Sequence, residues 1–230
     1  MNKNEKYIPE IISPLRSKTV AVPKSIYKAS GIKILKKRIK SLVFSTDVSI
    51  ISNCNADAVM AVYPFTPTMA ISQSIIQVAS NPVFVGVGGG LTSGPRVINL
   101  AMHADFLGAY GIVVNSPIPN ERIREMNEVL DIPIIASVVS FNDDIEGKIN
   151  AGADILNVSG GKNTIELVNQ IREKVGDEFP IIATGGPTEE LISQTIEAGA
   201  NAITFTPPTS GEIFSKIMQN YRTIKREENK

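Results

Sequence analysis

The chain of 230 residues contains no tryptophan, one cysteine and one histidine. The lone Cys54 excludes an internal disulfide and a cysteine-rich metal site, and the lone His103 cannot form a cluster of imidazole ligands. No apolar run reaches the roughly 18 residues that a membrane-spanning helix needs. The first ten residues also lack the apolar core of a secretory signal. We therefore expect a cytoplasmic protein with no membrane span and no metal site.

Net charge is zero, but the charges are spread unevenly. Residues 1–40 hold 11 Lys and Arg against 2 Asp and Glu, a balance of +9, and the rest of the chain holds 12 against 21, a balance of −9. Near the end of this basic arm, Ile32, Leu35 and Ile39 would share one face of a helix. The arm could bind nucleic acid or anionic lipid, or it could simply cover the bottom of the domain. The lack of interleaved aromatic residues disfavours nucleic acid.

A fourfold repeat begins after residue 40. An alanine followed by an acid or an amide marks each expected change from helix to strand. These acids and amides are Asp57, Asp105, Asp154 and Asn201, and successive members are 48, 49 and 47 residues apart. Between them, apolar runs follow three prolines: Pro82, Pro133 and Pro180. With a first run at 42–44, this makes eight strands that alternate with helices, and such units pair in parallel and close into a barrel. We predict a single (β/α)8 TIM barrel over 41–230 with a basic N-terminal extension over 1–40; an open doubly wound sheet is the alternative.

Helices are predicted from apolar periodicity and capping residues over 67–79, 94–103, 121–130, 143–150, 164–175, 189–198 and 212–224, with room for only a short helix after the first strand. In a TIM barrel the functional residues follow the carboxyl ends of the strands. The polar residues of the repeat lie at strand starts, so we interpret them as structural. The predicted functional rim is rich in Gly, Ser, Thr and Asn and poor in acids and bases.

The last two strands carry the clearest pattern. Residues 181–184 lead into Gly185-Gly186, and residues 202–205 lead into a hydroxyl-rich turn, residues 206–211. Both turns open helices at the same rim, where backbone amides and helix dipoles favour an anion.

The sequences IATGG and EAGANAITFTPP in this stretch resemble the phosphate-binding TIM barrels, in particular the keto-deoxy-phosphogluconate aldolases and the thiamin-phosphate and ribulose-phosphate-type barrels. The resemblance covers the last two strands well and the rest only as architecture. It implies that amides after strands seven and eight hold a phosphate, a role that falls here to Gly185, Gly186, Thr206, Thr209 and Ser210, with Gly160 and Gly161 as a third wall. The alternative is that the two glycines serve loop geometry alone.

The catalytic groups of those relatives are missing. A Schiff-base aldolase needs a lysine inside a strand, and no predicted strand has one. Asp47 after the first strand and Asp143 or Asp144 after the fifth could act as acid and base across the mouth, similar to the isomerase barrels of histidine synthesis. Each could instead cap the helix that follows. Lys162 could stabilise a phosphate or an enolate, or be solvated.

The other rim residues that we expect in the ligand pocket are Ser45, Tyr63, Gly88, Tyr110, Ser137, Asn157 and Thr184. The sequence thus predicts a barrel that binds a small phosphorylated metabolite and works as a metal-independent lyase or isomerase with no required cofactor. One alternative is an FMN-dependent oxidoreductase similar to the nitronate monooxygenases, with Gly88 to Gly90 against the flavin ring. Another is a non-catalytic phosphometabolite-binding protein. A homodimer is left open.

Overall fold

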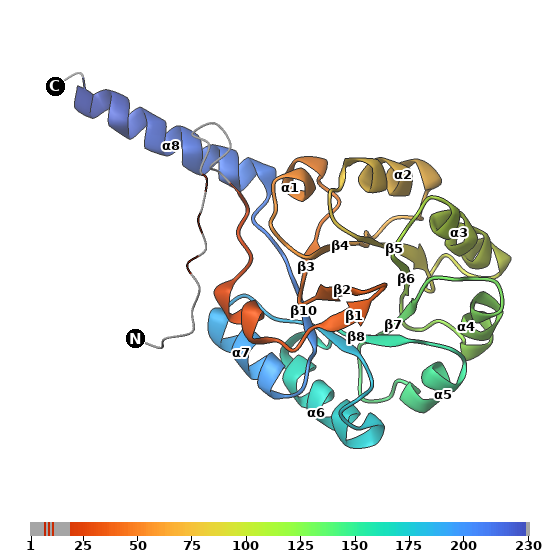
Figure 1. The fold of residues 1–230 in the computed structure, drawn as a ribbon. Coiled ribbons are helices and arrows are strands. Elements are labelled where there is room, and N and C mark those ends of the chain that lie inside the picture. The colour runs from red at the N-terminus through yellow and green to blue at the C-terminus, as the bar shows by residue number, and fades with distance from the viewer. Residues whose placement is uncertain (1–6, 8, 10, 12–18, 229–230) are drawn as a thin grey trace.

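A computed structural model describes residues 7, 9, 11 and 19–228. Eight parallel strands close into a barrel in the order β10-β3-β4-β5-β6-β7-β8-β9, so the predicted TIM barrel is confirmed (Figure 1). The strands are β3 (Ser41–Phe44), β4 (Ala58–Ala61), β5 (Val83–Gly88), β6 (Gly111–Val114), β7 (Ile134–Val138), β8 (Ile155–Val158), β9 (Ile181–Thr184) and β10 (Ala202–Phe205).

Helices follow the strands around the outside of the barrel (Figure 1). They are α1 (Val48–Ser52), α2 (Met69–Val78), α3 (Pro95–Phe106), α4 (Asn120–Asn127), α5 (Ile145–Asn150), a 3-10 turn η2 (Gly161–Asn163), α6 (Thr164–Val175), α7 (Glu189–Glu197) and α8 (Ser210–Glu228). Within the described part of the chain, no helix is long and apolar enough to cross a membrane.

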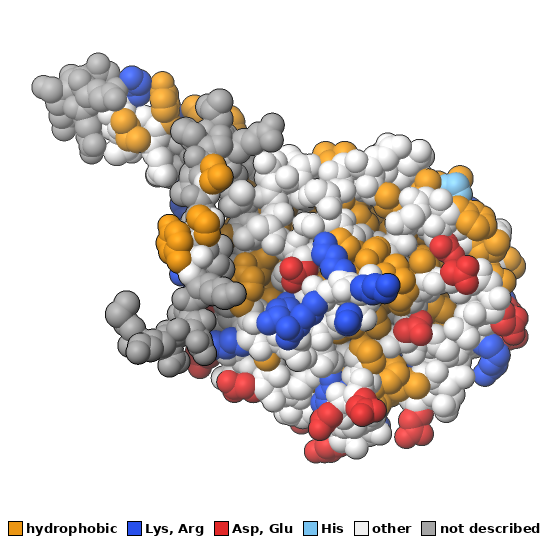
Figure 2. Space-filling model, in the orientation of Figure 1, with side chains coloured by type: hydrophobic (Ala, Val, Ile, Leu, Met, Phe, Trp, Pro, Cys, Tyr) orange, Lys and Arg blue, Asp and Glu red, His pale blue; other side chains and the backbone are white. Residues whose placement is uncertain are grey.

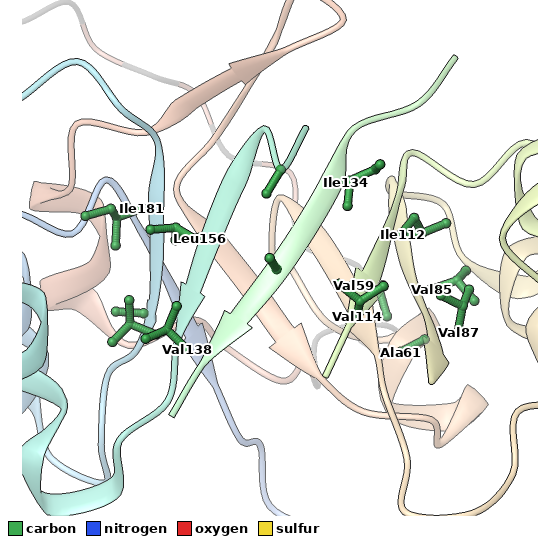
Figure 3. Packing of buried hydrophobic residues seen from close by; sticks show 14 of the residues in the cluster. Val59, Ala61, Val85, Val87, Ile112, Val114, Ile134, Val138, Leu156 and Ile181 are labelled. Carbon is green, nitrogen blue, oxygen red and sulfur yellow. The ribbon is translucent and has the colours of Figure 1, made fainter. Parts of the chain in front are cut away.

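The strands are buried on both faces, which is why they read as continuous apolar runs. Side chains that point outward from the strands, among them Val59, Val85 and Ile112 (Figure 3), belong to one buried cluster with side chains of the helices. Alternate residues, including Leu42 and Phe84, fill the barrel interior. This packed interior leaves the two ends of the barrel as the places where polar side chains can gather.

The polar residues of the sequence repeat tie neighbouring strands together at the amino end. The Asp57 carboxylate accepts from the amide and hydroxyl of Ser41, at the start of β3, at 3.1 and 3.0 Å. Asp154 accepts from the Ile134 amide of β7 at 2.8 Å, and Asn201 from the Ile181 amide of β9 at 2.9 Å. Each side chain thus satisfies the first donor of the preceding strand, and the structural interpretation of these three residues holds.

For the remaining member of the repeat, Asp105, the predicted place at the start of a strand is wrong. Asp105 lies inside α3, and β6 starts only at Gly111. The segment Gly108-Ala109-Tyr110 precedes β6 in the same way that Gly152-Ala153-Asp154 precedes β8. Tyr110 occupies the position that the acid has before the other strands. The start of the strand was therefore predicted at the nearest Ala-Asp pair, Ala104-Asp105.

The basic arm forms a hairpin where a helical face was expected. β1 (Ile32–Ile34) and β2 (Lys37–Ile39) pair antiparallel, and the hairpin lies across the end of the barrel (Figure 1). Its isoleucines pack against the residues of the barrel interior. β-branched residues at alternate positions are compatible with this strand pair, and burial of the isoleucines at the end of the barrel selects it. The turn between them places Leu35 at φ 43° and Lys36 at φ 69°. A left-handed backbone costs each of these residues about 1–2 kcal/mol.

The N-terminal segment also packs beside α7. The 3-10 turn η1 (Lys24–Lys28) contacts that helix, and the Glu189 carboxylate accepts from the amides of Lys24 and Ser25 at 2.9 and 2.7 Å. The last helix, α8, instead extends away from the barrel (Figure 1). Its Phe214, Tyr221 and Ile224 are each more than half exposed.

Candidate functional site

Two of the hollows at the carboxyl ends of the strands lie on opposite sides of the mouth. One, of about 580 Å³, lies at the turns after β8 and β9 and is lined by Gly161, Lys162, Thr184, Gly185 and Gly186 together with side chains of α6 and α7. The other, of about 330 Å³, lies at the turns after β4, β5 and β6. The first brings together five residues that the sequence predicted for the site.

The backbone of the first hollow is shaped by two glycines with left-handed φ, Gly161 at 62° and Gly186 at 79°. At Gly161 an added Cβ would meet no atom within 4 Å, so the backbone conformation requires glycine there and packing does not. Turns of this kind point backbone amides into a concavity that suits an anion. Lys162 is exposed beside them, and Thr164 begins the twelve-residue α6 at the same place.

Gly185, in contrast to Gly186, takes part in the sheet and in the packing of a helix against it. Its amide donates to the Thr204 carbonyl at 3.1 Å, within the sheet. An added Cβ would approach Ile203 Cγ2 to 2.6 Å and Ile192 Cγ1 to 2.8 Å. Gly185 therefore lets α7 pack closely on β10, and its predicted amide contact with a phosphate would have to replace a sheet hydrogen bond.

A polar layer lies inside the barrel just below the mouth. Asn157 of β8 is buried, and its Nδ2 lies 3.4 Å from Ser137 Oγ of β7. Its Oδ1 has no hydrogen-bond partner among the described residues. Thr204 of β10 and Met60 of β4 complete this layer, with the Thr204 hydroxyl 3.8 Å from the Met60 sulfur. Above it, the Thr184 hydroxyl donates to Ser159 Oγ at 3.2 Å. A buried amide with one free acceptor is a place for a donor group of a ligand.

Residues of the turn after β10 donate hydrogen bonds to two carboxylates. The Thr209 amide and hydroxyl donate to the Glu212 carboxylate at 2.7 and 2.8 Å, and Thr209 Oγ1 accepts from the Glu212 amide at 3.2 Å, which is the reciprocal pattern of a capping box. The Ser210 hydroxyl donates to Asp47 Oδ2 at 2.5 Å. These contacts fasten the start of α8 to the rim. The phosphate contacts predicted for Thr209 and Ser210 stay predictions, as does that of the exposed Thr206, and the first two would require these bonds to be exchanged.

Asp47 caps α1. Its Oδ1 accepts from the Ser49 amide and hydroxyl at 2.8 and 2.7 Å and from the Ile50 amide at 3.3 Å, and Ser45 Oγ accepts from the Asp47 amide at 3.1 Å. The hydrogen bonds from Ser210 and Ser49 lower the pKa of the Asp47 carboxyl from 3.8 to about 2. A group with that pKa is a weak proton acceptor near neutral pH. Of the two roles left open for Asp47, the structure shows the cap.

Asp143 organises the turn after β7. Its carboxylate accepts from the Ser116 hydroxyl at 2.5 Å and from the amides of Val139 and Ser140 at 2.8 and 2.9 Å. Burial raises the pKa of Asp143, but these hydrogen bonds and the nearby Lys148 outweigh it and leave the pKa below its ordinary value. The cap of the following helix is Asp144, which accepts from the Gly147 amide at 2.9 Å, so capping by Asp143 itself is wrong.

The second hollow contains Tyr63, Gly88 and Asn115. The Tyr63 hydroxyl accepts from the Thr68 amide at 2.9 Å, ahead of α2, and Gly88 has φ 115°. Asn115 directly follows β6, and the sequence selected Tyr110 from this stretch in its place because that strand was started too early. The Gly108-Ala109-Tyr110 match described above was the signal that could have found it.

Tyr110 is not a rim residue. It precedes β6 at the amino end of the barrel, where its ring meets Phe84 edge-on with centroids 6.3 Å apart. The expectation that it lines the ligand pocket is wrong, because the strand begins after this residue and not before it.

No protein-family model matches this chain, and no curated protein sequence matches it. Solved structures do resemble it. A protein described as a phosphonomutase from Burkholderia cenocepacia is 16% identical with a TM-score of 0.59, over 82% of this chain and 92% of that chain. For 2,3-dimethylmalate lyase, a member of the PEP mutase/isocitrate lyase superfamily, the identity is 13% and the TM-score 0.58, over 90% and 86%. For phosphonopyruvate hydrolase the values are 11% and 0.62, over 82% of each chain.

At these identities the comparison shows a shared fold. It does not confirm the keto-deoxy-phosphogluconate aldolase resemblance, and it lends no support to the flavin alternative. It also corrects one expectation. Phosphonopyruvate hydrolase was solved with oxalate and Mg++, so the prediction of a metal-independent protein with no required cofactor is contradicted and is withdrawn.

The residues of this chain do not offer a ready magnesium site. Among the described residues, no three His, Cys, Asp or Glu side chains are grouped so that they could hold a metal ion. The rim carboxylates of Asp47 and Asp143 each accept several hydrogen bonds of their own.

Proposed function

We propose that this chain is an enzyme of lyase or mutase type that acts on a small phosphorylated or phosphonate metabolite at the carboxyl end of the barrel. The observation that carries the proposal is the hollow at β8 and β9, where Lys162 and the left-handed turns of Gly161 and Gly186 border one space of about 580 Å³. The mutase, hydrolase and lyase named among the structural neighbours support this reaction class.

The charge of the hollow favours an anionic ligand. Its lining contains the cation of Lys162 and no carboxylate. The N-terminus of α6 adds the positive end of a helix dipole beside Thr164. Ile165 and Leu191 provide an apolar wall for the carbon part of the ligand.

Within this proposal, Lys162 binds the anion and stabilises negative charge that develops on the substrate. The free acceptor of Asn157 orients a donor group of the ligand at the barrel axis. Asp47 and Asp143 stay ionised at neutral pH because their pKa values are lowered, so they hold the rim turns in place and do not donate a proton.

A pair of variants at Gly186 tests the site. Gly186→Asp places a carboxylate beside the predicted phosphate, and Gly186→Asn is the matched control, since both side chains tolerate a left-handed φ. The ligands are phosphonopyruvate and phosphoenolpyruvate, with pyruvate as the control lacking phosphorus, each with and without Mg²⁺. At 100 times its dissociation constant a ligand stabilises the chain by about 2.7 kcal/mol, a rise of roughly 5–10 °C in Tm.

We expect the wild type and Gly186→Asn to be stabilised and Gly186→Asp to bind at least tenfold more weakly. Equal affinity in both variants, or no response of the wild type to any phosphorus-containing ligand, would contradict the phosphate site.

A non-catalytic binding protein is the second candidate. It is favoured because the carboxylates of Asp47 and Asp143 at the mouth accept hydrogen bonds from the protein itself. Phosphorus NMR of the bound ligand separates the two. Conversion of the ligand supports the enzyme, and tight binding with no turnover, with or without Mg²⁺, supports the binding protein.

A further inference from the structure

We propose that the β1–β2 hairpin at the amino end of the barrel docks the protein on an anionic membrane surface. The hairpin holds four cations, Lys33, Lys36, Lys37 and Arg38, and a fifth, Lys40, directly follows β2. Figure 2 shows Lys and Arg side chains gathered at the centre of this face, where Figure 1 places the hairpin. Clusters of this size are attracted to anionic lipid headgroups.

The cations are not consumed by the protein's own acids. In the described part of the chain, none of the five pairs with a carboxylate. The polar contacts of their side chains are with neutral oxygens: Lys37 with the Asn81 side chain, Arg38 with the Ser30 carbonyl and Lys40 with the Tyr27 carbonyl. The patch therefore keeps its charge for an external partner.

The hairpin also retains two features that weaken it locally. Lys33 and Arg38 stand directly opposite each other in the ladder, and like charges in that position repel. The turn uses Leu35 and Lys36 in a left-handed backbone that Asn-Gly would adopt with less strain. Backbone strain that a chain keeps is a reason to look for function there.

Leu35 distinguishes a membrane from other anionic partners. It sits at the hairpin tip, 65% exposed, between the cations of the two strands. An aliphatic side chain ringed by lysines can enter the boundary between headgroups and acyl chains while the charges contact the headgroups. A nucleic acid duplex accepts a leucine only as a wedge between unstacked bases, which costs a few kcal/mol for each step. Docking through this end leaves the mouth at the opposite end open to solvent, so the inference does not depend on the proposed reaction.

The test uses the full chain and flotation with vesicles of phosphatidylcholine, with and without phosphatidylserine. Two variants remove the contact while relieving local strain. Lys33→Glu places an acid opposite Arg38, and Leu35→Asn with Lys36→Gly installs a favourable turn. Both should keep or raise Tm, so lost binding cannot be attributed to unfolding. Lys216→Glu on α8 is the control with the same change of charge at a distant site.

We expect the wild type to bind only vesicles that contain phosphatidylserine, and less at higher salt. Each charge near the surface is worth about fivefold in affinity, so Lys33→Glu should weaken binding about 25-fold. The turn variant should lose about 50-fold through Leu35 and Lys36. Equal binding to both vesicles, an equal loss in Lys216→Glu, or binding to a nucleic acid duplex but not to vesicles would each overturn the proposal.

Discussion

The bond between Asp47 and Ser210 should fasten α8 to the barrel, and its removal can be measured. Ser210 makes the largest contribution to lowering the pKa of Asp47 from 3.8 to about 2. For a buried carboxyl this lowering would correspond to roughly 2.4 kcal/mol of folding free energy. Because Asp47 is only half-buried at the rim, where solvent screens its charge, we discount this figure to about 1 kcal/mol.

We expect Ser210→Ala to reduce the free energy of unfolding by about 1 kcal/mol, or about 2–4 °C in Tm. The pKa of the folded carboxylate is depressed, so its stabilisation is fully present above pH of about 4 and is lost as the pH falls toward about 2. The difference between wild type and variant should thus be constant from pH 5 to 7 in denaturant titrations, and it should shrink below pH of about 4.

Asp47→Ala completes a double-mutant cycle, and Ser74→Ala is the control. The Ser74 hydroxyl donates to the Ala70 carbonyl of its own helix, at 2.7 Å, and has no other partner among the described residues. The control should therefore change stability by less than about 0.5 kcal/mol, without the pH dependence. We expect Asp47 and Ser210 to be coupled by about 1 kcal/mol. Additive effects, or an effect of Ser210→Ala that persists unchanged to pH 2, would refute the reasoning.

Three further outcomes follow from the structure. Asn201→Ala should cost about 2–3 kcal/mol in denaturant titrations, because it leaves the Ile181 amide and the Arg172 guanidinium without the acceptor they share; a loss below about 0.5 kcal/mol would contradict this. Gly185→Ala should lower stability by about 1–3 kcal/mol through its contacts with Ile203 and Ile192, and an unchanged Tm would show that α7 can move aside. Burial raises the pKa of the Cys54 thiol, so its reaction with a thiol reagent at pH 8 should be slower than that of a free cysteine and should speed up on unfolding; equal rates in the folded and unfolded chain would contradict it.

The repeat in the sequence was sufficient to predict the barrel. Apolar runs after Pro82, Pro133 and Pro180 alternate with amphipathic helices at near-constant spacing, and a parallel sheet follows from that order. The structural interpretation of Asp57, Asp154 and Asn201 followed from the same pattern. Where a tyrosine replaced the acid, at Tyr110, the pattern failed and the rim was misassigned.

The N-terminal hairpin needed the tertiary structure. Ile32 and Ile39 fit one helical face as well as they fit a strand pair, and the end of the barrel decides between the two because it buries both isoleucines. The local sequence pattern alone carries no information about the end of the barrel that buries these isoleucines. A turn formed by Leu35 and Lys36 is also not one that sequence rules favour.

The sequence by itself thus determined the fold and gathered Lys162, Gly161 and Gly186 at one edge of it, since parallel strands bring their carboxyl ends together. It could not determine which donors there are free. Whether the hydroxyl of Ser210 meets a ligand or Asp47, and whether the amide of Gly185 points into the hollow or into the sheet, depends on distances between residues far apart in the chain. Only the tertiary structure fixes those distances.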